Sequence, residues 1–131
     1  MAVRSTQKKF TVSAAAIISN REGKILLLEH RLRPHSNWGL PGGFAKSGEQ
    51  PEAVIRREIS EETRLELSDL KLLLVRTIDR HVEILFTANT DGIVNINTRE
   101  IKDFGWFEPE TLPAEMSAAQ KKIIKIAAAS D

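Results

Sequence analysis

The sequence predicts an α/β fold in which a mixed β-sheet lies between helices, that is, an α/β/α sandwich. Short β-branched and apolar segments occur before, between and after two segments with helical character, an order typical of layered α/β proteins. The chain has 131 residues, enough to bury a core without disulfides. It contains no internal repeat, low-complexity tract or linker, so residues 1–131 are expected to form a single domain.

The first segments predict a hairpin followed by a loop. Residues 11–19 (TVSAAAIIS) and 24–29 (KILLLE) have the composition of strands, and the turn residues 20–23 join them. Residues 30–43 are rich in Pro, Gly, Asn and Ser, which predicts a loop. Trp38 within it is expected to anchor the loop against the core.

A helix is predicted from Pro51 to about Thr63. Proline is well suited to the first turn of a helix, because the N–H group that it lacks would have no intrahelical partner there. Ile55 and Ile59 are spaced at i and i+4, so they share a face that can pack against the sheet.

The second half of the chain predicts three further strands and a final helix. Residues 70–77, 81–88 and 101–107 have strand composition, and residues 89–92 (NTDG) are a turn signal. A helix is expected to begin near Ala114, after two prolines. Its apolar residues recur at spacings of three and four: Met116, Ala119, Ile123 and Ile126. This stripe indicates a core-facing helix, with a partner-binding surface as the alternative.

The composition excludes several functional classes. The 19 basic and 18 acidic residues give a net charge of +1, so neither a stable nucleic-acid complex nor membrane binding is expected. There is no cysteine, which excludes thiolate catalysis and cysteine-ligated zinc. The longest apolar run, residues 14–18, is too short to cross a bilayer, and we find no signal peptide. A cytoplasmic location is expected.

Three glutamates of the predicted helix lie unusually close together. At about 100° per residue, Glu58, Glu61 and Glu62 fall within one arc of about 100°. Like charges so spaced weaken a helix, whereas a bound Mg²⁺ or Mn²⁺ turns their repulsion into coordination by hard oxygen ligands. The alternative is a solvated helix face neutralised by its neighbours Arg56, Arg57 and Arg64.

The preceding loop favours the metal interpretation. Gly42 and Gly43 supply a turn whose carbonyl oxygens can face inward, Pro41 stiffens its entry, and Glu49 lies between the turn and the helix. No GxxxxGK[ST] pattern is present, so a phosphate group would be held by metal and basic side chains. The basic residues within reach along the sequence are Arg31, Arg33 and Lys46.

Residues 43–65 resemble the Nudix box, GX5EX7REUXEEXGU, in which U is a bulky aliphatic residue. Gly43, Glu49 and the run REISEETRL of residues 57–65 match eight of the nine specified positions. The WGLPG lead-in of residues 38–42 and the segments WF and ETLP near the end extend the likeness. The departure is Arg64, where the family has a glycine that closes the helix in a left-handed conformation.

The resemblance implies a Nudix-like fold and hydrolysis of a nucleoside diphosphate linked to another group, by attack of water on phosphorus with Mg²⁺ or Mn²⁺. It implies that Glu61 and Glu62 are the principal metal ligands and that Glu58 shares ligation or acts as the general base. The Gly42 carbonyl is implied as a further ligand. Glu49 would bind metal or orient the helix.

Two further roles follow from the resemblance. Arg57 would hold the catalytic carboxylates in place through charge-assisted hydrogen bonds. An acidic residue from outside the box often completes the metal site, and here Glu100 is the first candidate, followed by Glu83 and then Asp103.

The substrate is expected to be a nucleoside triphosphate or a small nucleotide derivative. Arg31 and Arg33 would attract its phosphates or are ordinary surface charges, and Trp38 would stack on it or belongs to the core. His81 would contact the base or is structural. A non-catalytic nucleotide-sensing domain is the alternative function, although all four box glutamates are present. Homodimers are common among the proteins that the chain resembles.

Overall fold

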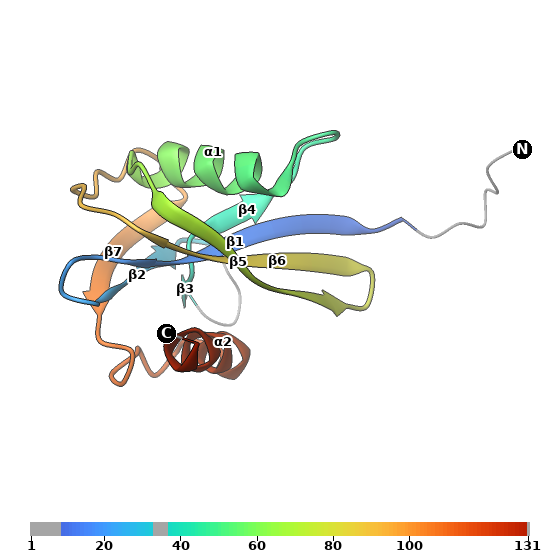
Figure 1. The fold of residues 1–131 in the computed structure, drawn as a ribbon. Helices are drawn as coiled ribbons and strands as arrows, with labels where there is room; N and C mark the ends of the chain where they lie inside the picture. The colour runs from blue at the N-terminus through green and yellow to red at the C-terminus, as the bar shows by residue number, and fades with distance from the viewer. Residues whose placement is uncertain (1–8, 33–36, 131) are drawn as a thin grey trace, which may run out of the picture.

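The computed structural model describes residues 9–32 and 37–130 (Figure 1). In chain order the elements are β1 (Thr11–Ser19), β2 (Ile25–His30), β3 (Trp38–Gly39), β4 (Gly42–Phe44), α1 (Pro51–Thr63), β5 (Ser68–Ile78), β6 (His81–Asn89), β7 (Ile101–Phe107) and α2 (Ala118–Ala129).

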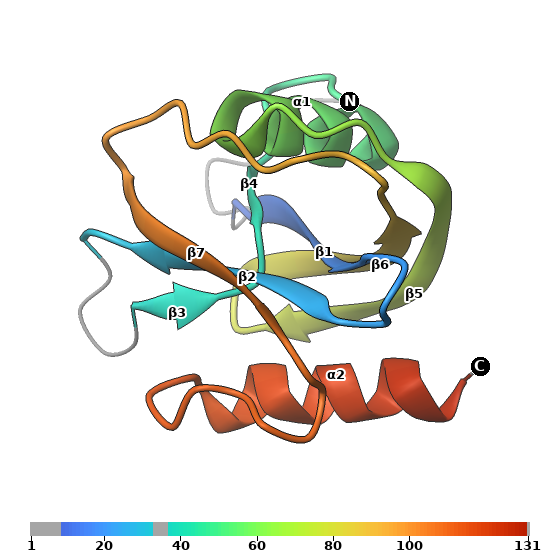
Figure 2. The same ribbon diagram turned by 90° about the vertical axis from the view of Figure 1, so that its left-hand side faces the viewer.

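The strands form one mixed sheet in the order β3-β2-β1-β6-β5, with β4 paired to β1 and β7 paired to β2. β1 and β6 run parallel along their whole lengths, whereas the other pairs are antiparallel. Helix α1 covers one face of the sheet and α2 covers the other (Figure 2). The predicted α/β/α sandwich is therefore confirmed.

Successive side chains of the central strands point to opposite faces of the sheet, and they form two hydrophobic clusters, one under each helix. In β2, Leu26 and Leu28 face α1, while Ile25 and Leu27 face α2. The sheet thus buries both faces, so its central strands read as continuous apolar runs. On the first face, α1 contributes Val54, Ile55 and Ile59, all fully buried, as the i, i+4 spacing predicted.

The main departure from the sequence prediction lies between residues 30 and 43. The predicted loop contains two short strands, β3 and β4. Residues such as Gly39 and Gly42 have little strand preference of their own, and pairing with Leu28 of β2 and Ala15 of β1 makes them strands.

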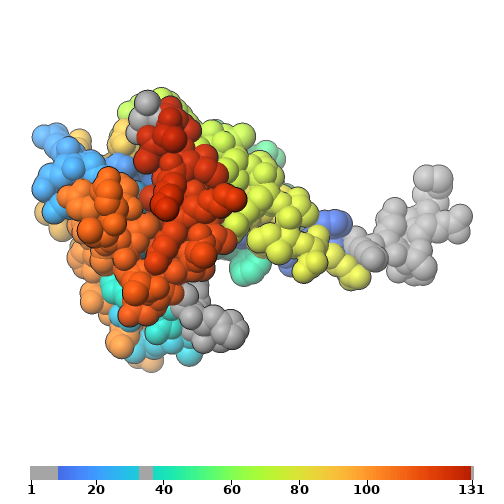
Figure 3. Space-filling model, turned by 90° about the horizontal axis from the view of Figure 1, so that it is seen from below, coloured from blue at the N-terminus to red at the C-terminus, as the bar shows by residue number. Residues whose placement is uncertain are grey.

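Helix α2 begins four residues later than predicted, at Ala118 rather than near Ala114. The Ser117 hydroxyl caps it by accepting a hydrogen bond from the Gln120 N–H at 3.2 Å. The predicted stripe is partly wrong, because Ala119 is exposed and Ile126 is 40% exposed. The residues of α2 that are buried are Ile123, Ile124 and Ala127. Figure 3 shows α2 lying across this side of the molecule.

Candidate active site

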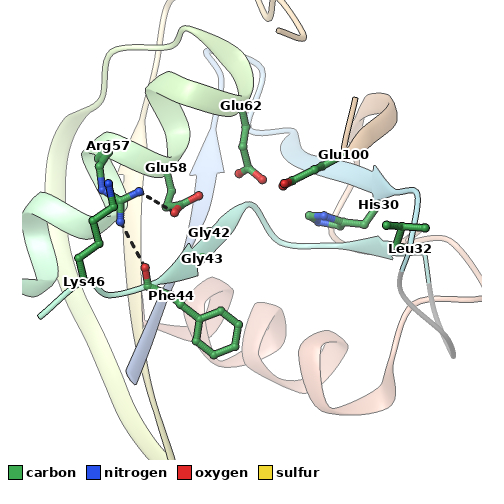
Figure 4. A pocket seen from close by; sticks show the side chains of 10 residues that line it. All are labelled: His30, Leu32, Gly42, Gly43, Phe44, Lys46, Arg57, Glu58, Glu62 and Glu100. Atoms are coloured by element: carbon green, nitrogen blue, oxygen red, sulfur yellow. Dashed lines mark hydrogen bonds and ion pairs between the residues drawn. The ribbon is translucent and has the colours of Figure 1, made fainter. Parts of the chain in front are cut away.

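Helix α1 directs Glu58 and Glu62 toward a pocket at the edge of strand β4. Packing of its apolar face fixes the helix on the sheet, and the i, i+4 spacing places these two carboxylates on a common face. Glu62 is buried, with only 6% of its surface exposed. Figure 4 shows both side chains pointing into the pocket.

The two glycines of β4 let the backbone pass close to its neighbours. Gly42 has a φ of +156°, and a Cβ atom there would collide with the Ala14 carbonyl oxygen. A Cβ atom at Gly43 would lie on the Glu58 carboxylate, with that group's oxygens 2.6 and 2.7 Å away. The glycine pair is therefore what allows Glu58 to rest against the strand.

Arg57 ties the loop, the helix and β4 together. Its Nε donates to Glu49 at 2.7 Å, and its Nη2 donates to Glu49 at 2.8 Å and to the Phe44 carbonyl at 3.2 Å. Its Nη1 donates to Glu58 at 2.8 Å and to Glu61 at 3.5 Å. The hydrogen bonds from Arg57 lower the pKa of Glu49 to about 2, and those to Glu49 raise the pKa of Arg57.

The pocket has a volume of about 430 Å³. Its described lining residues are His30, Leu32, Gly42, Gly43, Phe44, Lys46, Arg57, Glu58, Glu62 and Glu100. Glu100 precedes β7, and its carbonyl accepts a hydrogen bond from the Arg31 N–H at 2.8 Å. Figure 4 shows the carboxylates of Glu62 and Glu100 facing one another across the pocket. The structure thus places the first candidate for the acidic residue outside the box in this pocket.

The other two candidates do not line the pocket. Glu83 accepts a hydrogen bond from the Arg76 guanidinium at 2.5 Å, on strands β6 and β5. Asp103 is exposed on β7 and accepts from the Phe104 N–H at 2.8 Å.

One box glutamate, Glu61, is placed differently from what the resemblance implied, and Glu49 is placed in keeping with one of its two implied roles. Glu61 has 57% of its side chain exposed and does not line the pocket, so the structure does not bring this implied principal ligand to Glu62. Both carboxylate oxygens of Glu49 accept hydrogen bonds from Arg57, which favours its orienting role. As they lie, no three His, Asp or Glu side chains of residues 9–32 and 37–130 are close enough together to hold a metal ion.

Three of the predicted substrate-binding residues do not line the pocket: Arg31, Trp38 and His81. The Arg31 Nε donates to the Arg99 carbonyl at 2.9 Å. The Trp38 ring packs edge-to-face on Phe107, with centroids 5.3 Å apart, in the cluster under α2. This packing favours the core alternative for Trp38. The fourth residue, Arg33, lies outside the described residues.

The contacts of His81 favour the structural alternative for this residue. Its Nδ1 lies 2.6 Å from the Thr11 hydroxyl, and its Nε2 lies 2.8 Å from the Ser13 hydroxyl. Its ring stands edge-on to Phe44, with centroids 5.6 Å apart. Because both ring nitrogens are engaged on the sheet, hydrogen bonding to a base is not the arrangement that the structure shows.

His30 is a pocket residue that the sequence interpretation missed. It is buried at the end of β2 and lies near Glu100 in Figure 4. A signal was present, because Leu26, Leu28 and His30 alternate along one strand and should share the face that α1 covers.

Arg64 keeps the conformation for which the box has a glycine. It caps α1 with φ 61° and ψ 16°, in the left-handed region, and its N–H donates to the Ser60 carbonyl at 2.9 Å. The helix end is therefore retained rather than reshaped.

Residues 9–126 match the NUDIX domain family. The chain belongs to the Nudix family. A MutT-like protein from Streptomyces ambofaciens is 28% identical over 109 residues, which cover 82% of this chain and 70% of that protein. An ADP-ribose pyrophosphatase from Methanocaldococcus jannaschii is 32% identical over 116 residues, covering 82% of this chain and 68% of that protein. The solved structure of a MutT NUDIX hydrolase from Burkholderia pseudomallei has a TM-score of 0.80 and 29% identity, covering 90% of this chain and 98% of that one.

Membership of the Nudix family confirms the hydrolase class predicted from the box. The pocket lies where the Nudix box meets β4 and the segment before β7, so the matched motif and the geometry coincide. Among the described residues, no helix is long and apolar enough to cross a membrane.

Proposed function

We propose that this Nudix protein hydrolyses the pyrophosphate bond of a nucleoside triphosphate or small nucleotide derivative, with Mg²⁺ or Mn²⁺ as cofactor. The observation that carries the proposal is that three carboxylates line one pocket, those of Glu58, Glu62 and Glu100. One related protein is consistent with the proposal, since the Methanocaldococcus protein is an ADP-ribose pyrophosphatase.

The donors of the pocket fit a hard divalent cation. Glu62 and Glu100 face one another, and the repulsion between two such carboxylates favours a cation between them. Magnesium in proteins is commonly held by one or two carboxylates, with water and substrate phosphates completing its shell. Glu62 and Glu100 would hold the ion together with the Gly42 carbonyl. When bound, the ion supplies positive charge to the phosphoryl oxygens and the leaving group.

The side chains would then divide the remaining work. Glu58 would accept a proton from the water that attacks phosphorus, while the bond from phosphorus to the bridging oxygen breaks. Arg57 fixes the position of Glu58 through its Nη1 hydrogen bond and anchors the preceding loop through Glu49. Lys46 would attract the negative charge of the phosphates. The pocket volume of about 430 Å³ lies in the range of small-molecule sites.

The proposal is tested by measuring phosphate and pyrophosphate release from nucleoside triphosphates, dinucleotides and nucleotide sugars with Mg²⁺, Mn²⁺ or EDTA. We expect metal-dependent turnover that falls at least about 100-fold in Glu62→Gln, because a ligand of the metal is lost. Glu52→Gln is the matched control, since Glu52 is exposed on the same helix and does not line the pocket. Nucleotide binding without turnover by the unmodified protein would instead indicate a sensor.

A further inference from the structure

Phe44 is an exposed aromatic residue in the lining of the pocket. It ends β4, next to Gly43, and 64% of its surface is exposed. A Cβ atom at Gly43 would point at the Glu58 carboxylate, and successive residues of a strand point to opposite faces. The Phe44 side chain therefore leaves β4 on the side away from that carboxylate. Figure 4 shows the Phe44 ring below β4, with Glu58 and Glu62 above the strand.

The Phe44 ring is held in place by contacts of its own backbone and of its edge. The Phe44 carbonyl accepts a hydrogen bond from Arg57 Nη2 at 3.2 Å, and Phe44 pairs with Ser13 of β1. The ring stands edge-on to His81, with centroids 5.6 Å apart. That imidazole is itself held by the hydroxyls of Thr11 and Ser13, at 2.6 and 2.8 Å. An aromatic ring that is already fixed loses little freedom when a ligand stacks on it.

Phe44 is better placed than Trp38 to contact a nucleobase. Trp38 packs on Phe107 in the cluster under α2 and does not line the pocket. Among the described lining residues, only Phe44 and Leu32 carry apolar side chains, and a leucine has no π face. Every nucleobase has a π face, and stacking of a base on an aromatic side chain contributes strongly to binding. The pocket thus combines carboxylates on one side of β4 with a stacking surface on the other.

We propose that Phe44 stacks on the base of the nucleotide substrate, on the side of β4 opposite Glu58, while the phosphates lie at the carboxylates of the pocket. The inference rests on the proposed function and adds to it the residue that contacts the base. A purine presents a larger flat face than a pyrimidine, so the site should favour purine nucleotides. Stacking adds no hydrogen bond, so this selection depends on the size of the base rather than on its donors and acceptors.

The test compares a nucleotide with its phosphate part alone. The probes are inorganic triphosphate and analogues of ATP and CTP in which methylene groups replace the bridging oxygens between phosphates, so that they are not hydrolysed. We measure their dissociation constants by calorimetry with Mg²⁺. Phe44→Ala should bind the ATP analogue about tenfold more weakly, because a base–aromatic stack is lost. It should lose less affinity for the CTP analogue and none for inorganic triphosphate. Phe44→Trp keeps an aromatic ring and should retain the affinity for both analogues.

Phe10→Ala is the matched control, since Phe10 is 55% exposed and does not line the pocket. An unchanged affinity for the ATP analogue in Phe44→Ala would overturn the inference. An equal loss in Phe10→Ala, or an equal loss of affinity for inorganic triphosphate in Phe44→Ala, would overturn it as well. Hydrolysis is measured separately, on the unmodified protein with ATP and CTP. Absence of turnover, with the effects of Phe44→Ala on binding as expected, would count against the proposed hydrolysis and not against the stacking.

Discussion

At the residue scale, the pocket depends on contacts that leave no room for an added atom. Gly43 is the clearest case, since the Glu58 carboxylate occupies the space where any other residue would place its Cβ. Glu58 is in turn fixed by Arg57 and is the carboxylate to which we assign proton transfer. The glycine therefore sets the position of a side chain with which it shares no hydrogen bond.

Replacing Gly43 with alanine should lower turnover by about 100-fold or more, because the added methyl group displaces Glu58 from its place against β4. Gly48→Ala is the matched control. Gly48 has a φ of +78° with nothing within 4 Å of an added Cβ, so alanine there strains the backbone by about 1 kcal/mol without touching the pocket. Steady-state kinetics and thermal unfolding of both variants separate the two effects. Equal activity in the two variants would contradict the role of Gly43.

At the element scale, α1 is fixed by residues of the Nudix box at its middle and at its C-terminal end. From the middle of the helix, Arg57 donates two hydrogen bonds of 2.7 and 2.8 Å to Glu49 and so attaches the preceding loop. At its end, Arg64 closes the helix in a left-handed conformation. The buried side chains of Ile55 and Ile59 hold the helix on the sheet. This anchoring keeps the pocket carboxylates in place.

The attachment of the loop should depend on pH in a defined window. The hydrogen bonds from Arg57 lower the folded-state pKa of Glu49 from 4.5 to about 2. A lowered pKa contributes stability that is present above the unfolded value and disappears as pH falls. Glu49→Gln should therefore unfold at a lower temperature than the unmodified protein at pH 7. The difference in melting temperature between the two proteins should narrow as the pH falls from about 4.5 to about 2.

Thermal unfolding at several pH values checks this expectation, with Glu110→Gln as control. Glu110 is exposed and makes no ion pair with the described part of the chain. Its replacement should therefore leave the melting temperature unchanged at every pH. A difference of constant size across the whole window would show that the Glu49 charge is not what stabilises the loop.

At the C-terminal end of α1, replacing the cap residue Arg64 should not lower the stability of the protein and can raise it. Arg64 adopts φ 61°, which disfavours every residue with a Cβ atom, and its side chain is exposed. Arg64→Gly should leave the melting temperature unchanged or stabilise the protein by up to about 1 kcal/mol, with turnover retained. Asp79→Gly is a parallel case, with φ 52° at the turn between β5 and β6. A clear fall in melting temperature for Arg64→Gly alone would assign its side chain a specific role.

At the scale of the whole molecule, periodic elements were predictable from sequence and contacts between distant segments were not. The first strand (residues 11–19), the α1 helix and the last strand (residues 101–107) have the predicted bounds, since their apolar patterns are strong. Strands β3 and β4 were missed because their pairing is imposed by other strands. His30 joins Glu62 and Glu100 only through the register of β2 with β7. Glu61 shares a helical arc with Glu62 but is directed toward Arg57.

The pocket joins the α1 layer to the sheet, so a cation bound there should stabilise the molecule as a whole. A ligand that binds only the folded state adds about 2.7 kcal/mol at 100 times its dissociation constant, which corresponds to several degrees in melting temperature. We expect Mg²⁺ or Mn²⁺ to raise the melting temperature of the unmodified protein and to lose most of this effect in Glu62→Gln and in Glu100→Gln. The variant Glu61→Gln tests whether Glu61 is a metal ligand, as the box pattern implies, or not, as its exposed position indicates. If the box pattern alone decides ligation, it should abolish the shift as fully as Glu62→Gln does, whereas the exposed position of Glu61 predicts that most of the shift is retained.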